Sequence, residues 1–121
     1  MLLALSACAD PTVSDQALHR DLETGANGAE VYFHATLLSA PYRAGGHERM
    51  EVRNVAGDLL EVDHNLSLAP WAAAAKGDVV LVRGRLYIDG PGRAGVHCTH
   101  AATSLSCPYP GWIQVGQTRF S

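Results

Sequence analysis

The sequence predicts an all-β domain with short helices, built as a five-stranded Greek-key barrel. Three observations predict it. Apolar residues recur with a period of two in several segments, as in half-buried strands. Clusters of glycine and proline separate these segments and are typical of turns. One alanine-rich segment of helical composition falls between the third and the fourth strand. This order matches the OB-fold, with an SH3-like barrel or a small β-sandwich as the alternatives.

The first eight residues look like the end of a bacterial lipoprotein signal. We interpret residues 1–8 as a truncated signal peptide that ends in the lipobox Leu5-Ser6-Ala7-Cys8. Small residues before the cysteine, with an apolar run before them, are what the processing enzymes require. The run is short and carries no basic residue, so a short buried helix end is the alternative. We expect Cys8 to be lipidated and to anchor the chain to a membrane, in the periplasm or cell envelope.

Residues 9–29 are expected to form a tether and a short helix. The helix is predicted over residues 14–24, where Ser14 is a favoured N-cap residue. Gly25 can end the helix, because glycine readily adopts the left-handed conformation found there.

The OB-fold-like domain is expected over residues 30–121. Its first three strands alternate apolar and polar residues, and the turn that joins the second to the third contains Gly57. The expected strands cover residues 30–37, 47–54 and 59–64, with a loop over 39–46 and a tight turn at 56–58.

A helix is expected next, over residues 66–76. Pro70 suits its first turn, four alanines follow, and Gly77 can stop it. The later strands are expected at residues 78–89, 95–99 and 112–115. Gly84 in the middle of the first of these indicates a bulge or a bend. In an OB barrel we expect the fifth strand to pair with the first.

The composition disfavours a general nucleic-acid binder. The net charge is −3, from nine basic and twelve acidic residues, and a basic surplus is absent. No nucleophile elbow, phosphate loop or His-Glu-x-x-His motif occurs in the sequence. A binding function is therefore favoured over an enzymatic one.

Two cysteines remain once Cys8 is assigned to lipid. In an oxidising compartment an even pair predicts a disulfide between Cys98 and Cys107. Two free thiols or two metal ligands are the alternatives.

Several short runs resemble a family of secreted bacterial proteins, grouped as domain-of-unknown-function family 3465. The two most specific runs are His64-Asn65-Leu66-Ser67-Leu68-Ala69-Pro70 and His97-Cys98-Thr99-His100, the latter followed by Gly111-Trp112-Ile113. The family usually has tryptophan at the position of Cys98 and histidine at that of Ala101. The resemblance covers roughly residues 30–120. It implies a secreted location and brings no established activity.

Four histidines lie in the pieces that carry this resemblance: His47, His64, His97 and His100. We expect His47 and His64 to lie close together, because the start of the second strand faces the end of the third. Neutral imidazoles that cluster are typical of zinc sites, so these four are the candidate metal ligands, with zinc as the candidate ion. Residues three apart in a strand point to opposite faces, so His97 and His100 meet only if the strand ends between them. The alternative is that they bond backbone groups at strand ends.

The leading hypothesis is a lipid-anchored OB-fold-like module that binds a small molecule, a glycan or a protein partner. The candidate ligand-binding residues are His47, Arg49, His64, Asn65, His97, Thr99, His100 and Trp112. OB-folds bind ligands over the second and third strands and the loops beside them. A metal-binding protein or metal-dependent hydrolase is the alternative, and a structural envelope lipoprotein is another.

Overall fold

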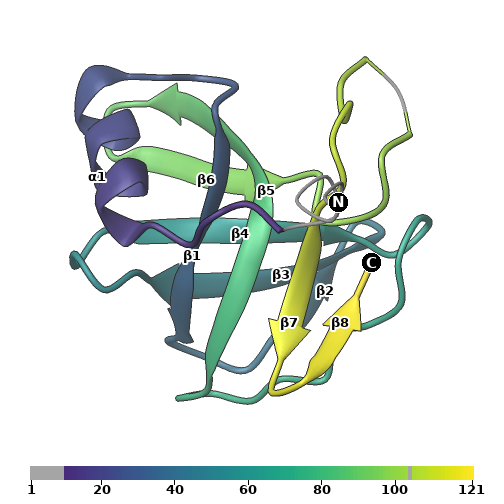
Figure 1. Cartoon of the computed structure of the whole chain (residues 1–121). Helices are drawn as coiled ribbons and strands as arrows, with labels where there is room; N and C mark the ends of the chain where they lie inside the picture. Colours follow the sequence, from purple (N-terminus) through teal and green to yellow (C-terminus); the bar gives the residue numbers. More distant parts are fainter. Residues whose placement is uncertain (1–9, 104) are drawn as a thin grey trace, which may run out of the picture.

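The computed structural model describes residues 10–103 and 105–121, and in them the chain is mostly β (Figure 1). The helix α1 covers Asp15–Thr24 and precedes all strands of the sheet. The strands are β1 Glu30–Leu37, β2 Tyr42–Ala44, β3 His47–Arg53, β4 Leu59–Asn65, β5 Val79–Gly90, β6 Arg93–His97, β7 Trp112–Val115 and β8 Thr118–Phe120. They form one mixed sheet of eight strands. The predicted β-rich class and the N-terminal helix are confirmed.

Helix α1 begins and ends where the sequence predicts. The Ser14 hydroxyl accepts a hydrogen bond from the Ala17 N–H at 3.1 Å, and Gly25 has φ of 69° at the C-terminal end. Leu18 is fully buried and belongs to the core formed by the sheet. The helix therefore packs Leu18 into the core. Its capping residues Ser14 and Gly25 form hydrogen bonds with backbone groups at its two ends.

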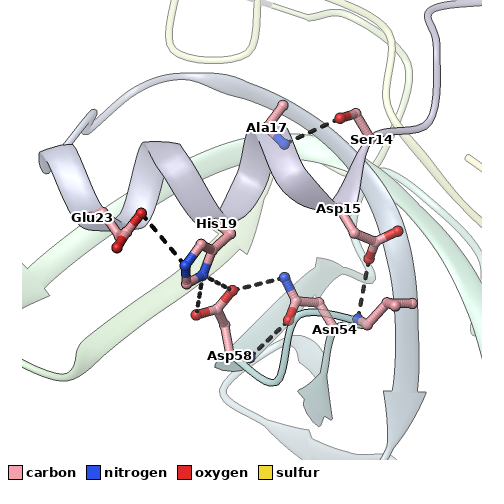
Figure 2. A network of polar contacts seen from close by, with 8 residues as sticks. Ser14, Asp15, Ala17, His19, Glu23, Asn54 and Asp58 are labelled. Carbon is pink, nitrogen blue, oxygen red and sulfur yellow. Dashed lines mark hydrogen bonds and ion pairs between the residues drawn. The ribbon is translucent and has the colours of Figure 1, made fainter.

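A polar network ties α1 to the turn between β3 and β4 (Figure 2). His19 Nδ1 lies 3.0 Å from the Asp58 carboxylate, and the Asn54 side-chain amide donates to Asp58 at 2.9 Å. Asp15 accepts the Val55 N–H at 3.3 Å. The helix is thus held by the core on one side and by this turn on the other.

Six of the eight strands have at least two partners each, and β6 pairs differently from our expectation. β1 pairs antiparallel with β3 and with β5, and β3 pairs antiparallel with β4. β6 pairs in parallel with β4 and antiparallel with β5. The expectation that it pairs with β1 was wrong: β5 occupies that edge of β1. β7 continues from β5, and β8 from β7.

β5 changes partner near Gly84, where the sequence predicted a bulge or a bend. Its first part pairs with β1 as far as Arg85, and from Arg85 onward it pairs with β6. A Cβ on Gly84 would lie 2.4 Å from the His97 carbonyl oxygen. Glycine is therefore required there by the close approach of β6. The register shift itself lies later, between Ile88 and Gly90.

The prediction of a helix over residues 66–76 is wrong. This segment is turn and irregular backbone, despite its alanines. Its backbone groups bond to side chains of the neighbouring strands: the Ala72 N–H donates to Glu48 at 2.6 Å, and the Pro70 carbonyl contacts His64 at 2.8 Å. Tertiary hydrogen bonds replace the helical ones, so the alanine propensity is overridden.

Three smaller differences concern the strands. The predicted loop over 39–46 contains β2, which forms a hairpin with β3. β6 starts and ends two residues before the predicted strand at 95–99, because Cys98 adopts φ of 59° and leaves the sheet. The strand at 112–115 is confirmed, and β8, which pairs with it, was missed.

Candidate functional site

A pocket of about 260 Å³ lies where β4 and β6 end and β3 begins. Three of the four predicted histidines, His47, His97 and His100, line it. We call it the histidine pocket; its other lining residues are Asp63, Asn65, Leu68, Cys98, Thr103, Ser106 and Cys107. The end of β6 therefore reaches the same rim as the start of β3, a point that the sequence left open.

His97 and His100 share this pocket because the strand ends between them. β6 stops at His97, and Cys98 turns the chain with φ of 59°. The disulfide between Cys98 and Cys107 is present, with an S–S distance of 2.03 Å, so the predicted bridge is confirmed. The bridge closes the loop that follows β6. Gly111 closes the loop's other end: its N–H donates to the His100 carbonyl at 2.8 Å.

His64 points away from the pocket, into the interior. In the β3–β4 register His47 faces Asn65, and His64 faces Glu48, so His47 and His64 lie on opposite faces of the sheet. The His64 ring is fully buried. Its Nε2 lies 2.8 Å from the Pro70 carbonyl, which only accepts, so Nε2 carries the proton. The Thr99 hydroxyl then donates to Nδ1 at 2.7 Å.

The buried His64 ring is held neutral. Burial lowers its pKa, and the hydrogen bond to the Pro70 carbonyl opposes this only in part. Burial likewise lowers the pKa of His97, assisted by the charge of Arg85. Neutral imidazoles are hydrogen-bond partners and metal ligands, whereas imidazolium ions only donate.

Glu48 is the second buried polar group beside His64. Its side chain is fully buried, and Oε1 accepts the Ala72 N–H at 2.6 Å. Oε2 has no hydrogen-bond partner among the described residues. Burial raises the pKa of this carboxyl to about 7. Glu48, His64 and Thr99 thus form a buried polar layer beneath the irregular segment 66–76.

A polar network covers the outer face of β3, β4 and β5 next to the pocket. The Tyr87 hydroxyl lies 2.5 Å from Asp63 Oδ2 and 2.9 Å from Glu61 Oε2. Arg49 Nε donates to Asp63 at 3.0 Å and lies 3.3 Å from Glu61. The single phenol proton can be donated to only one of the two carboxylates at a time. Burial raises the pKa of the Glu61 carboxyl in this network.

This face continues from the histidine pocket to a second hollow. The Tyr87 ring meets the His97 ring edge-on, with the centroids 5.5 Å apart. At the other end Tyr87 also lines a more open pocket of about 420 Å³, together with Glu61, Asp89 and Arg93. We call this the turn pocket, because it lies beside the β5–β6 turn. The outer face is therefore one polar surface with a hollow at each end.

The remaining predicted site residues have separate positions. Asn65 lines the histidine pocket, and its side-chain oxygen accepts the Ser67 N–H at 2.8 Å. Trp112 does not line either hollow described above: it packs edge-on against Tyr32, and the Arg119 guanidinium lies 3.9 Å from its ring centroid. The ring of Trp112 therefore packs against side chains of β1 and β8.

The four histidines do not form a set of metal ligands in the described part of the chain. There, the residues that bring three candidate ligand atoms within 4.8 Å of one another are Cys98, His100 and Cys107. Zinc requires such proximity, because each ligand atom lies about 2.0–2.3 Å from the ion. His64 is turned inward by the period of β4, which explains its absence from such a set.

Asp63, Glu61 and Tyr87 belong to the site and were missed as site residues. The signal was present, because Glu61, Asp63 and Asn65 are polar at every second position of β4 and share its outer face. The pairing of Tyr87 with them depends on the β4–β6–β5 order, which the sequence did not predict.

No protein-family model, curated protein or solved structure matches the chain. None of the helices in residues 10–103 and 105–121 is long and apolar enough to cross a membrane. The predicted lipidation site, Cys8, lies outside the described residues.

Proposed function

We propose that the chain is a secreted, lipid-anchored, OB-fold-like module that binds a small polar molecule or a glycan unit on the outer face of β3 and β4. The observation that carries the proposal is the histidine pocket, where three imidazoles, an amide and a carboxylate converge at the end of that face. Membership of family 3465 is part of the same proposal.

The strand pairing supports an OB-type barrel. The strands β1, β3, β4, β6 and β5 pair in that order, and β5 pairs again with β1. An OB-fold has the same cycle of strand pairings, and in that comparison β3 and β4 correspond to its second and third strands. The face that carries the two hollows corresponds, under this proposal, to the usual ligand surface of an OB-fold.

The chemistry of this face supports a polar ligand. Imidazole, amide and carboxylate groups accept and donate hydrogen bonds to hydroxyls, and the Tyr87 ring offers an apolar edge beside them. The histidine pocket, at about 260 Å³, lies just below the usual size of small-molecule sites, so it suits one sugar-sized group.

The disulfide supports an extracytoplasmic location, because such bonds persist in oxidising compartments. Mass spectrometry of the mature protein tests the lipid anchor: a diacylated N-terminal Cys8 is expected. An unmodified N-terminus in protein taken from membranes would refute this part of the proposal.

Ligand binding is tested with the purified full chain, by thermal-shift screening against mono- and oligosaccharides followed by NMR. We expect chemical-shift changes at His97 and Asn65, and loss of binding in His97→Ala. His34→Ala is the matched control, because His34 is exposed on β1 and does not line either pocket. A broad screen without any thermal shift, together with no partner in a crosslinking pull-down, would count decisively against a binding module.

A metal-binding role for the three pocket histidines, His47, His97 and His100, is the second candidate, without the buried His64. It is favoured by the three imidazoles in one pocket and by the burial that keeps His97 neutral. Elemental analysis of untagged protein decides it: one equivalent of metal that is lost in His97→Ala supports it, and substoichiometric metal refutes it.

A further inference from the structure

Next to the disulfide lies an imidazole in reach of both sulfurs. One ring nitrogen of His100 and the sulfurs of Cys98 and Cys107 all lie within 4.8 Å of one another. His100 is almost fully buried, with 2% of its surface exposed, so its ring is fixed by its surroundings. The arrangement holds two sulfur atoms and one nitrogen at a single point of the histidine pocket.

A backbone contact fixes the tautomer of the neutral His100 ring. Its Nδ1 lies 2.8 Å from the Ala101 carbonyl oxygen, which only accepts, so Nδ1 carries the proton in the neutral ring. Nε2 is then the nitrogen with a free lone pair. Ligating histidines commonly donate their other N–H to a backbone carbonyl in this way, which sets the tautomer and the ring orientation.

We propose that Cys98, Cys107 and His100 form a zinc site that is closed in the oxidised protein and opens on reduction of the disulfide. In the disulfide neither sulfur is a thiolate, so the site cannot hold zinc. Two thiolates and one imidazole are three of the four ligands of a tetrahedral zinc site. The fourth position faces the pocket, whose walls also carry His47 and His97.

The redox step needs a dithiol reductant. A dithiol attacks one sulfur and ends as a disulfide itself, and Cys98 and Cys107 take up the two electrons and two protons as thiols. Cys107 is the more accessible sulfur, because Cys98 is only 4% exposed, so attack falls on Cys107. Zinc then binds the two thiolates and releases their two protons to solvent.

The geometry of the chain allows the sulfurs to separate. The two Cα atoms lie 5.3 Å apart, and tetrahedral zinc places its two sulfurs about 3.8 Å from each other at Zn–S bonds of about 2.3 Å. Rotation of the Cys98 and Cys107 side chains provides this change. This site shares His100 and the histidine pocket with the proposed polar ligand. It differs from the four-histidine set because only reduction of the disulfide creates it.

The experiment uses the full chain in a Cys8→Ser background, so that the pair supplies all thiols. Zinc affinity is measured by chelator competition before and after reduction, and cobalt is used as a spectroscopic substitute. We expect one equivalent of zinc to bind the reduced protein roughly tenfold or more tightly than the oxidised protein, with thiolate-to-cobalt charge-transfer bands.

Variants of His100 distinguish zinc binding at this site from binding of zinc to the two thiols alone. His100→Ala and His100→Gln are expected to weaken zinc binding by roughly tenfold or more, while the control His34→Ala leaves it unchanged. Circular dichroism checks that each reduced protein is folded when zinc is present. Equal affinity in the two redox states, unchanged affinity in both folded His100 variants, or a reduced chain that stays unfolded with zinc would each overturn the proposal.

Discussion

Replacing Glu48 with glutamine should remove a large part of the pH dependence of folding. The Glu48 carboxyl is fully buried, its Oε1 accepts the Ala72 N–H, and its Oε2 has no partner among the described residues. Burial raises its pKa from 4.5 to about 7. The folded protein therefore keeps this proton at pH values where the unfolded chain has lost it.

The sign follows from proton uptake. Below pH 4.5 both states are protonated, and the contribution of Glu48 is fully present. As the pH rises from 4.5 to about 7, the unfolded chain binds fewer protons than the folded one, so stability falls. A difference of about 2.5 pKa units at about 1.4 kcal/mol each limits the total loss to about 3.5 kcal/mol.

Urea unfolding of wild type and Glu48→Gln, at about pH 4 and about pH 8, measures this quantity. The glutamine oxygen can still accept the Ala72 N–H, and the variant has no charge to bury. We expect its stability relative to wild type to rise by up to about 3 kcal/mol between the two pH values. Glu51→Gln, on the outer face of the same strand, controls for the loss of a carboxylate. A relative stability of Glu48→Gln that is the same at both pH values would refute the reasoning.

Three further predictions concern the loop and the helix. Replacing both Cys98 and Cys107 with serine should cost roughly 2–3 kcal/mol in urea unfolding, because the bridge closes a short loop with a sequence separation of 9; an unchanged midpoint would contradict this. Gly111→Ala should cost roughly 1–3 kcal/mol, because its Cβ would lie 2.0 Å from the Cys98 carbonyl oxygen; a stability equal to wild type would show that the loop relaxes freely. The hydrogen bond to Asp58 raises the pKa of His19, so its support for the helix is present below about pH 6.5 and lost as the pH rises through the folded pKa. Asp58→Asn should lower the His19 pKa in an NMR titration, and an unchanged pKa would contradict the contact.

The period of two predicted the sheet well, because each strand has one buried face. β1, β3 and β4 appear at the predicted positions, and Ser14 and Gly25 cap α1 as expected. β2 and β8 are only three residues long, so alternation could not identify them. The order of pairing around the sheet also follows from contacts distant in sequence, which the local pattern does not contain.

The prediction of a helix over residues 66–76, the alanine-rich segment, failed for a physical reason. Alanine favours a helix by a fraction of a kcal/mol per residue. A buried carboxyl or imidazole left without a partner costs about 1–3 kcal/mol or more. Glu48 and His64 face this segment from two strands, and each needs a backbone partner from it. The side chains of the strands therefore decide the backbone of the segment.

The same reasoning applies to the candidate site. The alternation places His47 on the same face as the outward-facing Arg49, and His64 on the same face as the buried Val62. The sequence therefore already predicts that His47 and His64 lie on opposite faces of the sheet. The proximity of Tyr87 to Asp63 was not predictable, because it depends on β6 lying between β4 and β5.

The buried polar layer links the stability of the sheet to the geometry of the pocket. His64 on β4 and Thr99 beyond β6 share a hydrogen bond of 2.7 Å in the interior. On either side of Thr99 the chain carries Cys98 and His100 into the pocket. The hydrogen bond to His64 fixes the position of Thr99 in the interior. It thereby holds the neighbouring disulfide and the His100 ring at fixed positions in the histidine pocket. A change in the protonation of His64 would therefore act on the pocket through Thr99, although His64 itself lines no part of it.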